Sequence, residues 1–129
     1  MKKIIIYFED EEDFREVARI DLEEKLPNYR IITQEGGHKY GNAAGCINEV
    51  FKQIENLRLI AMVCTDGNLA GDVAGWDIVE ELRHRGYDGP ALYIGGTLLP
   101  KEKAHLYVDR ADKTGEGLIS VIKRHIKNE

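Results

Sequence analysis

Acidic residues directly follow two apolar runs in this sequence, and their types and spacing suit a metal site. Glu9 and Asp10 come after residues 3–8, and Asp66 comes after residues 57–65. Carboxylates that gather at one place raise one another's pKa values unless a cation neutralises them. A hard divalent ion is the natural partner, because Mg²⁺ commonly takes one or two carboxylates together with waters and phosphate oxygens. A site for a hard divalent ion such as Mg²⁺ is therefore one candidate chemistry.

Each acidic segment also has a purely structural explanation. Residues 9–13 could form an acidic first turn that complements a helix dipole. Asp66 precedes Gly67 and Asn68, and all three residue types favour turns. Both segments, however, follow an apolar run that predicts a buried strand, and they do so in the order that a shared site requires. The combination favours the functional interpretation over two unrelated turns.

The elements that would hold these residues alternate along the chain. Short apolar runs rich in β-branched residues predict strands buried on both faces, as in a parallel sheet. Apolar residues at spacings of three and four predict amphipathic helices between them. The predicted strands are residues 3–8, 29–33, 57–65, 91–94 and, around a core of 106–108, a fifth strand. The predicted helices are residues 12–26, one around Ile47, Val50, Phe51 and Ile54, 74–85, a short one from near Pro100, and 115–127.

This alternation predicts an α/β fold with right-handed crossovers and a parallel sheet covered on both faces. In an open sheet of this kind, ligands bind beyond the carboxyl ends of the strands. The residues at those ends are Glu9 and Asp10, Asp66, residues 95–97, and Asp109 with Arg110. We therefore expect three of the carboxylates to gather at one end of the sheet, with a basic residue opposite.

Composition restricts the class of protein. The chain has 129 residues, of which 43% are hydrophobic, and its formal net charge is -5. These values predict one domain over residues 1–129 and argue against binding to nucleic acid or anionic membranes by bulk charge. We find no signal peptide and no apolar run that could span a membrane. Cys46 and Cys64 lie apart in apolar contexts, which favours two buried thiols in a reducing cytoplasm.

Three segments resemble the receiver domains of two-component response regulators, and the resemblance covers essentially the whole chain. IIIYFEDEEDFREV resembles the family's first strand with its acidic pair, CTDGNLAGDVAGWDIVEELR resembles the phosphoacceptor strand with the loop after it, and LYVDRAD resembles the fifth-strand segment. The matching positions are Glu9, Asp10, Asp66, Leu69, Ala70 (for Pro), Gly71, Gly75, Tyr107 (for the aromatic residue), Arg110 (for Lys) and Ala111 (for Pro).

The resemblance implies a flavodoxin-like, doubly wound (βα)5 fold with a five-stranded parallel sheet in the order 2-1-3-4-5. It also implies that Asp66 accepts a phosphoryl group from a phosphohistidine of a sensor histidine kinase or phosphotransfer protein. Arg110 or Lys113 would contact a phosphoryl oxygen, while Asn68 and Thr97 would border the site and tune the access of water. The residues implied to bind Mg²⁺, directly or through water, are Glu9, Asp10, Asp66 and Asn68 through its carbonyl.

A receiver of this kind is a signalling protein and not an enzyme, apart from slow magnesium-dependent self-dephosphorylation. We expect a free-standing cytoplasmic domain without an output domain, which signals by docking to a downstream protein or by relaying its phosphoryl group. It would bind no nucleic acid by itself and would not insert into a membrane, while a homodimer remains open. Two surfaces are candidates for partner contact, residues 100–110 and the loop at residues 38–40.

Two of the departures from the family pattern, at Gly95 and Arg110, affect the site most directly and leave alternatives open. Gly95 stands where the family has Ser or Thr, and Thr97 could substitute for it only through a shift of the backbone. Arg110 keeps a positive charge, but its planar fork differs from a compact ammonium. A degenerate receiver that binds a partner without phosphorylation is therefore one alternative. A small hydrolase with Asp66 as nucleophile lacks an obvious general acid and a cap insertion, and nucleotide binding lacks a P-loop or GxGxxG motif.

Overall fold

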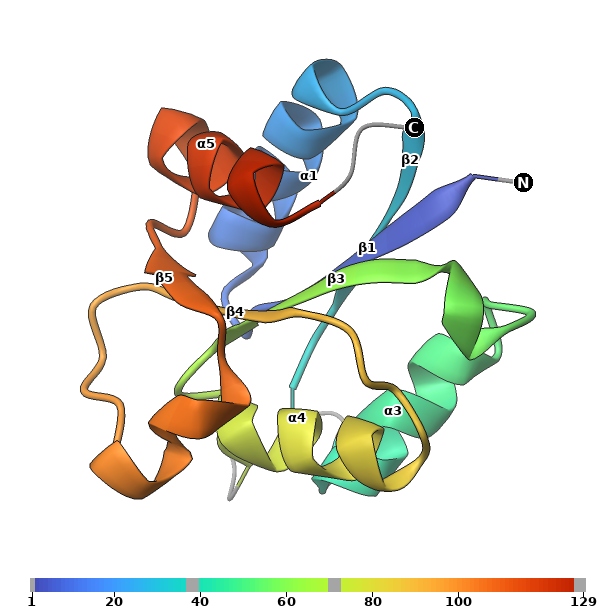
Figure 1. Cartoon of the computed structure of the whole chain (residues 1–129), viewed down its shortest axis with the longest axis vertical. Helices are drawn as coiled ribbons and strands as arrows, with labels where there is room; N and C mark the ends of the chain where they lie inside the picture. The colour runs from blue at the N-terminus through green and yellow to red at the C-terminus, as the bar shows by residue number, and fades with distance from the viewer. Residues whose placement is uncertain (1, 37–39, 70–72, 127–129) are drawn as a thin grey trace.

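The computed structural model describes residues 2–36, 40–69 and 73–126, which form an α/β fold around one parallel sheet (Figure 1). The order across the sheet is β2-β1-β3-β4-β5, and each neighbouring pair is parallel. This arrangement confirms the predicted doubly wound class and the strand order 2-1-3-4-5. The strands are β1 (Lys3–Phe8), β2 (Tyr29–Gln34), β3 (Ile60–Asp66), β4 (Ala91–Ile94) and β5 (Asp109–Ala111).

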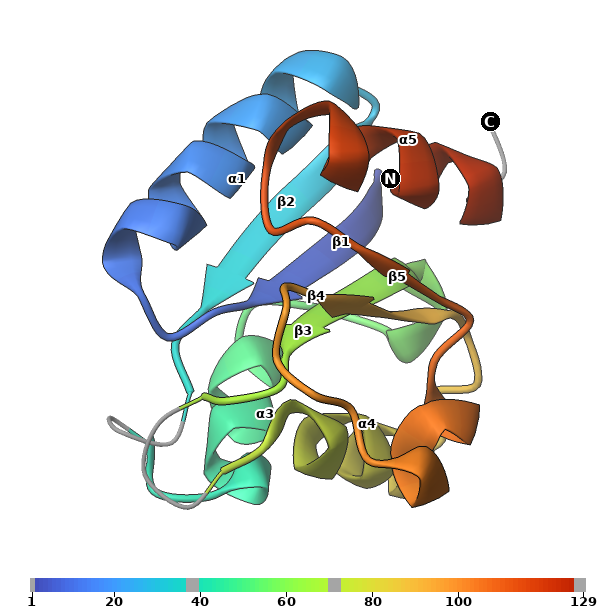
Figure 2. The ribbon, with the colours of Figure 1, turned by 90° about the vertical axis from the view of Figure 1, so that its left-hand side faces the viewer.

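The helices lie in two layers, one on each face of the sheet. Figure 2 shows α1 and α5 together on one face and α3 and α4 together on the other. Two short 3-10 helices, η1 and η2, precede β3 and β5. The bounds are α1 (Glu12–Lys25), α3 (Ala43–Phe51), η1 (Leu57–Leu59), α4 (Gly75–His84), η2 (Lys101–Leu106) and α5 (Gly115–His125).

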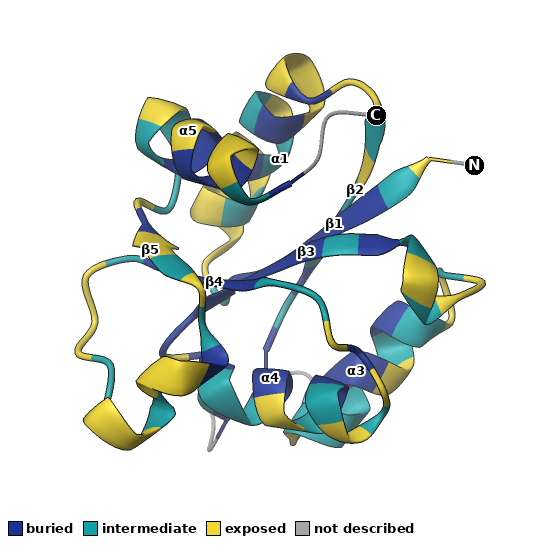
Figure 3. Cartoon of the chain, in the orientation of Figure 1, coloured by how far each residue is buried: buried dark blue, intermediate teal, exposed yellow. Residues whose placement is uncertain are grey.

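Alternation of side chains along β1 builds a core on both faces of the sheet, because successive residues of a strand point to opposite faces. Ile5 and Tyr7 pack with residues of α1 and α5. Ile4, Ile6 and Phe8 pack with residues of α3 and α4. Figure 3 shows β1, β3 and β4, the central strands, as the most continuously buried part of the chain. A strand with two covered faces requires an uninterrupted apolar run, and that requirement explains the sequence of β1.

Two strand predictions need correction. The third strand begins at Ile60 rather than Leu57, because Leu57–Leu59 form η1, and Asp66 is the last residue of the strand. The prediction of a fifth strand around residues 106–108 is wrong, because Leu106 belongs to η2 and β5 runs over Asp109–Ala111. The apolar side chain of Leu106 packs against Val79 and Ala91 instead of forming part of a strand. The apolar signal was therefore that of a helix end and not that of a strand.

The remaining element predictions hold with small shifts. The predicted short helix follows Pro100 and is the 3-10 helix η2, whereas Ile54 lies beyond the end of α3. Cys46 and Cys64 are buried free thiols in the cores of opposite faces, as expected. Within the described ranges, no helix combines the length and the apolar character needed to cross a membrane. The loop residues 38–39 and the end of the last predicted helix at residue 127 lie outside the described residues.

Candidate functional site

Two carboxylates and one ammonium group meet at the carboxyl end of the sheet. Glu9 follows β1, Asp66 ends β3, and Lys113 follows β5. The Lys113 Nζ lies 3.2 Å from Glu9 Oε2 and 3.2 Å from Asp66 Oδ2. Glu9 is fully buried and Asp66 is 5% exposed, so water screens these charges weakly. The structure thus brings together the predicted carboxylates from the first and third strands, with Lys113 as their cation.

Three neighbours fix the position of Lys113. The buried hydroxyl of Tyr7 in β1 donates a 2.6 Å hydrogen bond to the Lys113 carbonyl. The Lys113 ammonium also lies 4.4 Å from the centre of the Phe14 ring in α1, a cation–π contact. A Cβ atom added at Gly95 would lie 2.9 Å from Lys113 Cε, and Gly95 has a φ of +93°. Glycine at this position therefore serves both the backbone conformation and the path of the lysine side chain.

Arg15 of α1 holds the acidic loop after β1. Its Nη1 donates to the carbonyl of Glu9 at 2.9 Å and to that of Asp10 at 2.7 Å. The Glu9 side chain accepts from the backbone N–H of Glu11 at 3.1 Å through Oε1. These bonds orient the buried carboxylate toward Asp66 rather than toward solvent. Sequence reasoning missed Arg15, because an arginine in the first turns of an amphipathic helix predicts only a solvated face.

The electrostatics of the site follow from burial and from the ion pairs. Burial raises the pKa of Glu9, the backbone N–H of Glu11 lowers it, and the negative charge of Asp66 raises it further. Burial alone would lower the pKa of Lys113, but the charges of Glu9 and Asp66 raise it above its ordinary value. Lys113 therefore remains protonated at neutral pH and is a permanent cation between the two carboxylates.

Close backbone packing shapes the turn after Asp66. The Gly67 N–H donates a 2.7 Å hydrogen bond to Asp66 Oδ1, and the Gly67 carbonyl accepts from the N–H of Gly75 at 3.0 Å. A Cβ atom at Gly75 would lie 1.9 Å from the Asp66 carbonyl oxygen, so the start of α4 approaches β3 as only glycine allows. Asn68 is exposed in this turn. The other loop positions in the family resemblance, Ala70 and Gly71, lie outside the described residues.

The predicted set of metal ligands is only partly assembled. In the part of the chain that the structure describes, no three or more His, Cys, Asp or Glu side chains group closely enough to hold a metal ion. Glu9 and Asp66 are the two carboxylates that share the Lys113 ammonium, and the assignment of Asp10 and Asn68 as further ligands stays a prediction. Lys113 hydrogen-bonds Glu9 through Oε1 at 3.4 Å and forms an ion pair with the buried Oε2 at 3.2 Å. Two carboxylates are enough for Mg²⁺ with its waters.

Arg110 and Thr97 are held away from the carboxylates. Arg110 lies in the middle of β5 and donates to the Gly95 carbonyl at 3.1 and 2.9 Å and to the Thr97 carbonyl at 2.6 Å. Its guanidinium also lies 5.0 Å from the centre of the Tyr93 ring. Of the two predicted basic candidates, Lys113 rather than Arg110 therefore contacts Asp66. Thr97 is exposed, and its carbonyl rather than its hydroxyl takes part in this arrangement.

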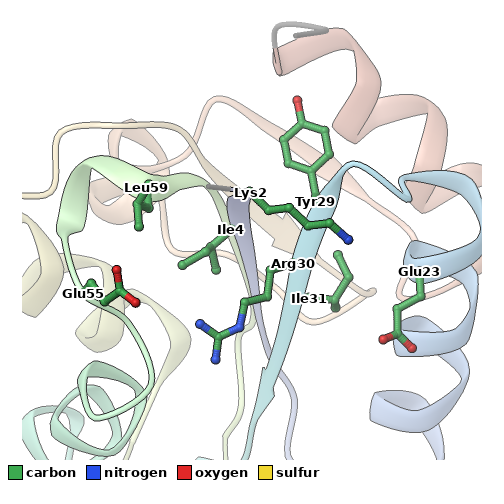
Figure 4. Close-up of a pocket in the computed structure, with 8 residues that line it drawn as sticks. All are labelled: Lys2, Ile4, Glu23, Tyr29, Arg30, Ile31, Glu55 and Leu59. Atoms are coloured by element: carbon green, nitrogen blue, oxygen red, sulfur yellow. The ribbon is translucent and has the colours of Figure 1, made fainter.

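A hollow of about 370 Å³ lies at the opposite end of the sheet (Figure 4). It is lined by residues from the start of β1, from β2 and from the segment before β3. Its charged side chains are Lys2, Glu23, Arg30 and Glu55, and all four are exposed. Arg30 donates to the Gln53 carbonyl at 2.6 Å. The hollow lacks buried charge, and it lies at the end of the sheet where doubly wound folds do not usually bind ligands.

Comparison with solved structures gives the class of fold. The chemotaxis response regulator CheY4 of Vibrio cholerae superposes with a TM-score of 0.72 at 14% identity, covering 98% of this chain and 100% of that one. The response regulator TrrA of Thermotoga maritima, in complex with Mg²⁺-BeF, gives 0.66 at 20% identity over 98% and 100%. The receiver domain of NtrX from Brucella abortus gives 0.67 at 20% identity over 97% and 99%.

These likenesses show that the chain has the fold of response-regulator receiver domains over nearly its full length. No protein-family model matches the sequence, and no curated protein matches it. Identities of 14–20% establish the fold and do not establish the activity. The activity must be argued from the residues of this chain.

Proposed function

We propose that this chain is a response-regulator receiver that accepts a phosphoryl group on Asp66. The observation that supports the proposal most is the meeting of three groups at one end of the sheet. The Asp66 carboxylate at the end of β3 lies 3.2 Å from the Lys113 ammonium, which in turn lies 3.2 Å from the buried Glu9. A nucleophilic carboxylate, a cation beside it and a second carboxylate for a metal are the parts that phosphoryl transfer to aspartate requires.

Glu9 and Asp66 would hold the magnesium ion, with Asp10 through water and with the carbonyl of Asn68. The burial of the Glu9 and Asp66 carboxylates at the same end of the sheet supports this assignment. When bound, Mg²⁺ would offset the negative charge that an incoming phosphoryl group adds to a site that already contains two carboxylates. One neighbour, TrrA, was crystallised with Mg²⁺-BeF, a group that mimics a bound phosphoryl.

The protein's own residues would supply the nucleophile, the position and the charge. An Asp66 oxygen attacks phosphorus in line, a P–O bond forms, and the P–N bond to the donor imidazole breaks and leaves its electron pair on nitrogen. Lys113 then contacts a phosphoryl oxygen, while Tyr7 and Gly95 keep its side chain aimed at Asp66. The Gly67 N–H, which bonds Asp66 Oδ1, keeps the other carboxylate oxygen oriented. Arg110 has no direct part in this scheme, because it is engaged with backbone carbonyls.

The partners follow from the same chemistry. A phosphohistidine on a sensor histidine kinase or a phosphotransfer protein would be the donor, and one neighbour, TrrA, was solved in complex with the histidine kinase ThkA. The output would be contact with a downstream protein rather than binding to DNA. The loop between β4 and η2 and the segment before β5 are candidate surfaces, because Leu98 is 84% exposed and Val108 is 49% exposed. Homodimerisation and a cytoplasmic location remain part of the proposal.

Intact-mass analysis after incubation with Mg²⁺ and acetyl phosphate tests the proposal. We expect one added phosphoryl group that requires Mg²⁺ and disappears in Asp66→Asn. Asp88→Asn is the matched control, because it makes the same chemical change at an exposed residue in the turn before β4, at the opposite end of the sheet. Its mass gain should equal that of the unchanged chain. A phosphoryl group that persists in Asp66→Asn would show that another residue is modified.

A degenerate receiver that binds a partner without phosphorylation is the second candidate. Lys113 is compatible with it, because this side chain pairs with both carboxylates in the absence of a metal. The absence of any hydroxyl at Gly95 favours it. The two candidates separate in the same experiment, since a degenerate receiver gains no phosphoryl mass from acetyl phosphate or from a phosphorylated histidine donor.

A further inference from the structure

Two buried side-chain atoms lack a hydrogen-bond partner within the described structure, and both lie at the carboxyl end of the sheet. One is Glu9 Oε2, an acceptor, and the other is the hydroxyl of Tyr93, a donor. A buried polar group without a partner costs about 1–3 kcal/mol, so such atoms are rare and call for an explanation. Glu9 Oε2 already faces the Lys113 ammonium at 3.2 Å, so the Tyr93 hydroxyl is the atom with neither a hydrogen bond nor an ion pair. An anion beside this hydroxyl would satisfy it.

The Tyr93 hydroxyl lies against the backbone that follows Asp66. Tyr93 is the third residue of β4 and pairs in register with Thr65, one residue before the end of β3. A Cβ atom added at Gly67 would lie 2.0 Å from the Tyr93 hydroxyl oxygen, so the absence of a side chain at residue 67 makes room for it. The charge of Asp66 also acts on the hydroxyl and raises its pKa after the larger effect of burial, while Arg110 lowers it. The phenol therefore keeps its proton and remains a donor at neutral pH.

A second tyrosine next to Tyr93 shows what a satisfied hydroxyl looks like in this part of the sheet. The rings of Tyr93 and Tyr107 meet edge to face, with centroids 5.1 Å apart. The Tyr107 hydroxyl shares a 2.9 Å hydrogen bond with the Thr65 hydroxyl, and Arg110 lies over the Tyr93 ring. These contacts fix the ring of Tyr93 without giving its hydroxyl an acceptor. The hydroxyl is held in place and still lacks a partner.

We propose that the Tyr93 hydroxyl donates a hydrogen bond, directly or through one water, to the phosphoryl group that Asp66 carries. This inference rests on the proposed function. It assigns to a residue of β4 a contact with the phosphoryl group, in a chain that has no hydroxyl at Gly95. An anionic phosphoryl oxygen is a stronger acceptor than a neutral group, so the unpaired donor gains the most from that ligand. The buried donor also favours an anion with hydrogen-bond acceptors over a ligand that has none.

The test compares Tyr93→Phe with Tyr107→Phe, because each change removes one hydroxyl from neighbouring rings of equal size. The measurement is the affinity for beryllofluoride with Mg²⁺, by calorimetry, together with phosphorylation by acetyl phosphate followed by intact mass. We expect Tyr93→Phe to bind beryllofluoride about tenfold more weakly, the usual effect of losing one hydrogen bond to a charged group. Tyr107→Phe should bind within about twofold of the unchanged chain, because its hydroxyl is committed to Thr65.

Thermal melting of both variants without ligand separates a ligand contact from general packing. Tyr93→Phe should melt at the same temperature as the unchanged chain or higher, because it removes an unpaired buried group. Tyr107→Phe should melt lower, because Thr65 then loses its partner. Equal affinities in Tyr93→Phe and the unchanged chain would overturn the inference while leaving phosphorylation of Asp66 intact. Equal weakening in both variants would also overturn it, and an unchanged chain that takes up neither ligand would overturn the proposed function as well.

Discussion

Charged side chains of both signs gather at each end of the sheet, but they are buried only at the carboxyl end. There Glu9 and Asp66 are almost inaccessible to water and share the Lys113 ammonium. At the amino end, the charged side chains around the hollow in Figure 4 are all exposed. Burial removes water as the alternative partner, so a buried ion must find its counter-charge in the protein or in a ligand. The residue types alone do not distinguish the two ends of the sheet, because both contain acidic and basic side chains.

The largest effect that separates the two ends should come from removing a basic side chain at each. Lys113→Met leaves two buried carboxylates without a cation, and we expect the free energy of unfolding to fall by about 2–4 kcal/mol. Arg30→Met at the amino end removes an exposed side chain with one hydrogen bond to a carbonyl, and it should cost less than about 1 kcal/mol. Urea unfolding in a buffer free of divalent ions measures both values.

Added Mg²⁺ sharpens this comparison. If the carboxylates hold the ion, Mg²⁺ should stabilise Lys113→Met more than the unchanged chain, because Lys113 no longer neutralises part of their charge. Arg30→Met keeps the site intact and should gain only as much stability as the unchanged chain, since a ligand that binds the native state stabilises it by mass action. Equal losses in the two variants would mean that the buried pair contributes no more than a surface contact. Burial would then not distinguish the two ends of the sheet.

The second-largest effect should appear when two adjacent glycines, Gly95 and Gly96, are each replaced by serine. Gly95 borders the buried site. Gly95→Ser forces a side chain onto a backbone with a φ of +93° and places its Cβ 2.9 Å from Lys113 Cε. We expect a loss of about 1–3 kcal/mol in the free energy of unfolding. Gly96→Ser is the matched control, because a Cβ atom there meets nothing within 4 Å, and it should be nearly neutral. Urea unfolding measures the difference.

This second comparison also concerns the missing hydroxyl. A serine at residue 95 restores the residue type that the family has, but it competes for space with the lysine that contacts Asp66. We therefore expect Gly95→Ser to take up a phosphoryl group from acetyl phosphate more slowly than Gly96→Ser, as followed by intact mass. Faster uptake in Gly95→Ser would show that the backbone relaxes and that the hydroxyl is tolerated.

The sequence predicted the fold and the acidic half of the site because both depend on local patterns. Continuous apolar runs separated by amphipathic helices lead to a parallel sheet, and the carboxyl ends of its strands lie along one edge. Glu9 and Asp66 follow such runs directly, so their meeting could be predicted without coordinates. Asp10 also follows a run, but its part as a further ligand stays a prediction.

The basic residue of the site could not be predicted in the same way. Choosing between Arg110 and Lys113 depends on where a three-residue strand ends, and the apolar residues 106–108 suggested a strand in the wrong place. Tyr93 gave no signal at all, because an aromatic residue in an apolar run predicts a buried strand and nothing more. The space that its hydroxyl occupies depends on Gly67, which lies in the loop after β3. Only the three-dimensional structure shows that Gly67 and the Tyr93 hydroxyl are neighbours.

The smallest effect follows from the raised pKa of Glu9 and concerns pH. Burial makes the native state hold the Glu9 proton to higher pH than the unfolded chain does, in which the pKa is near 4.5. The native state thus binds more protons across that window, and the contribution of Glu9 to the free energy of unfolding falls as pH rises through it. A tenfold change in proton affinity corresponds to about 1.4 kcal/mol. Lys113 and the N–H of Glu11 oppose the effect of burial, so the slope should be modest.

Glu9→Gln isolates this slope, since an amide of the same shape does not titrate. In urea unfolding from about pH 4 to about pH 8 without divalent ions, we expect the unfolding free energy of the unchanged chain to decline relative to Glu9→Gln as pH rises, until Glu9 is fully ionised. Glu23→Gln beside the exposed hollow is the control and should run parallel to the unchanged chain. Mg²⁺ should remove the relative decline, because a cation at Oε2 favours the ionised form. A decline that Mg²⁺ leaves untouched would place the ion elsewhere than at the buried carboxylate.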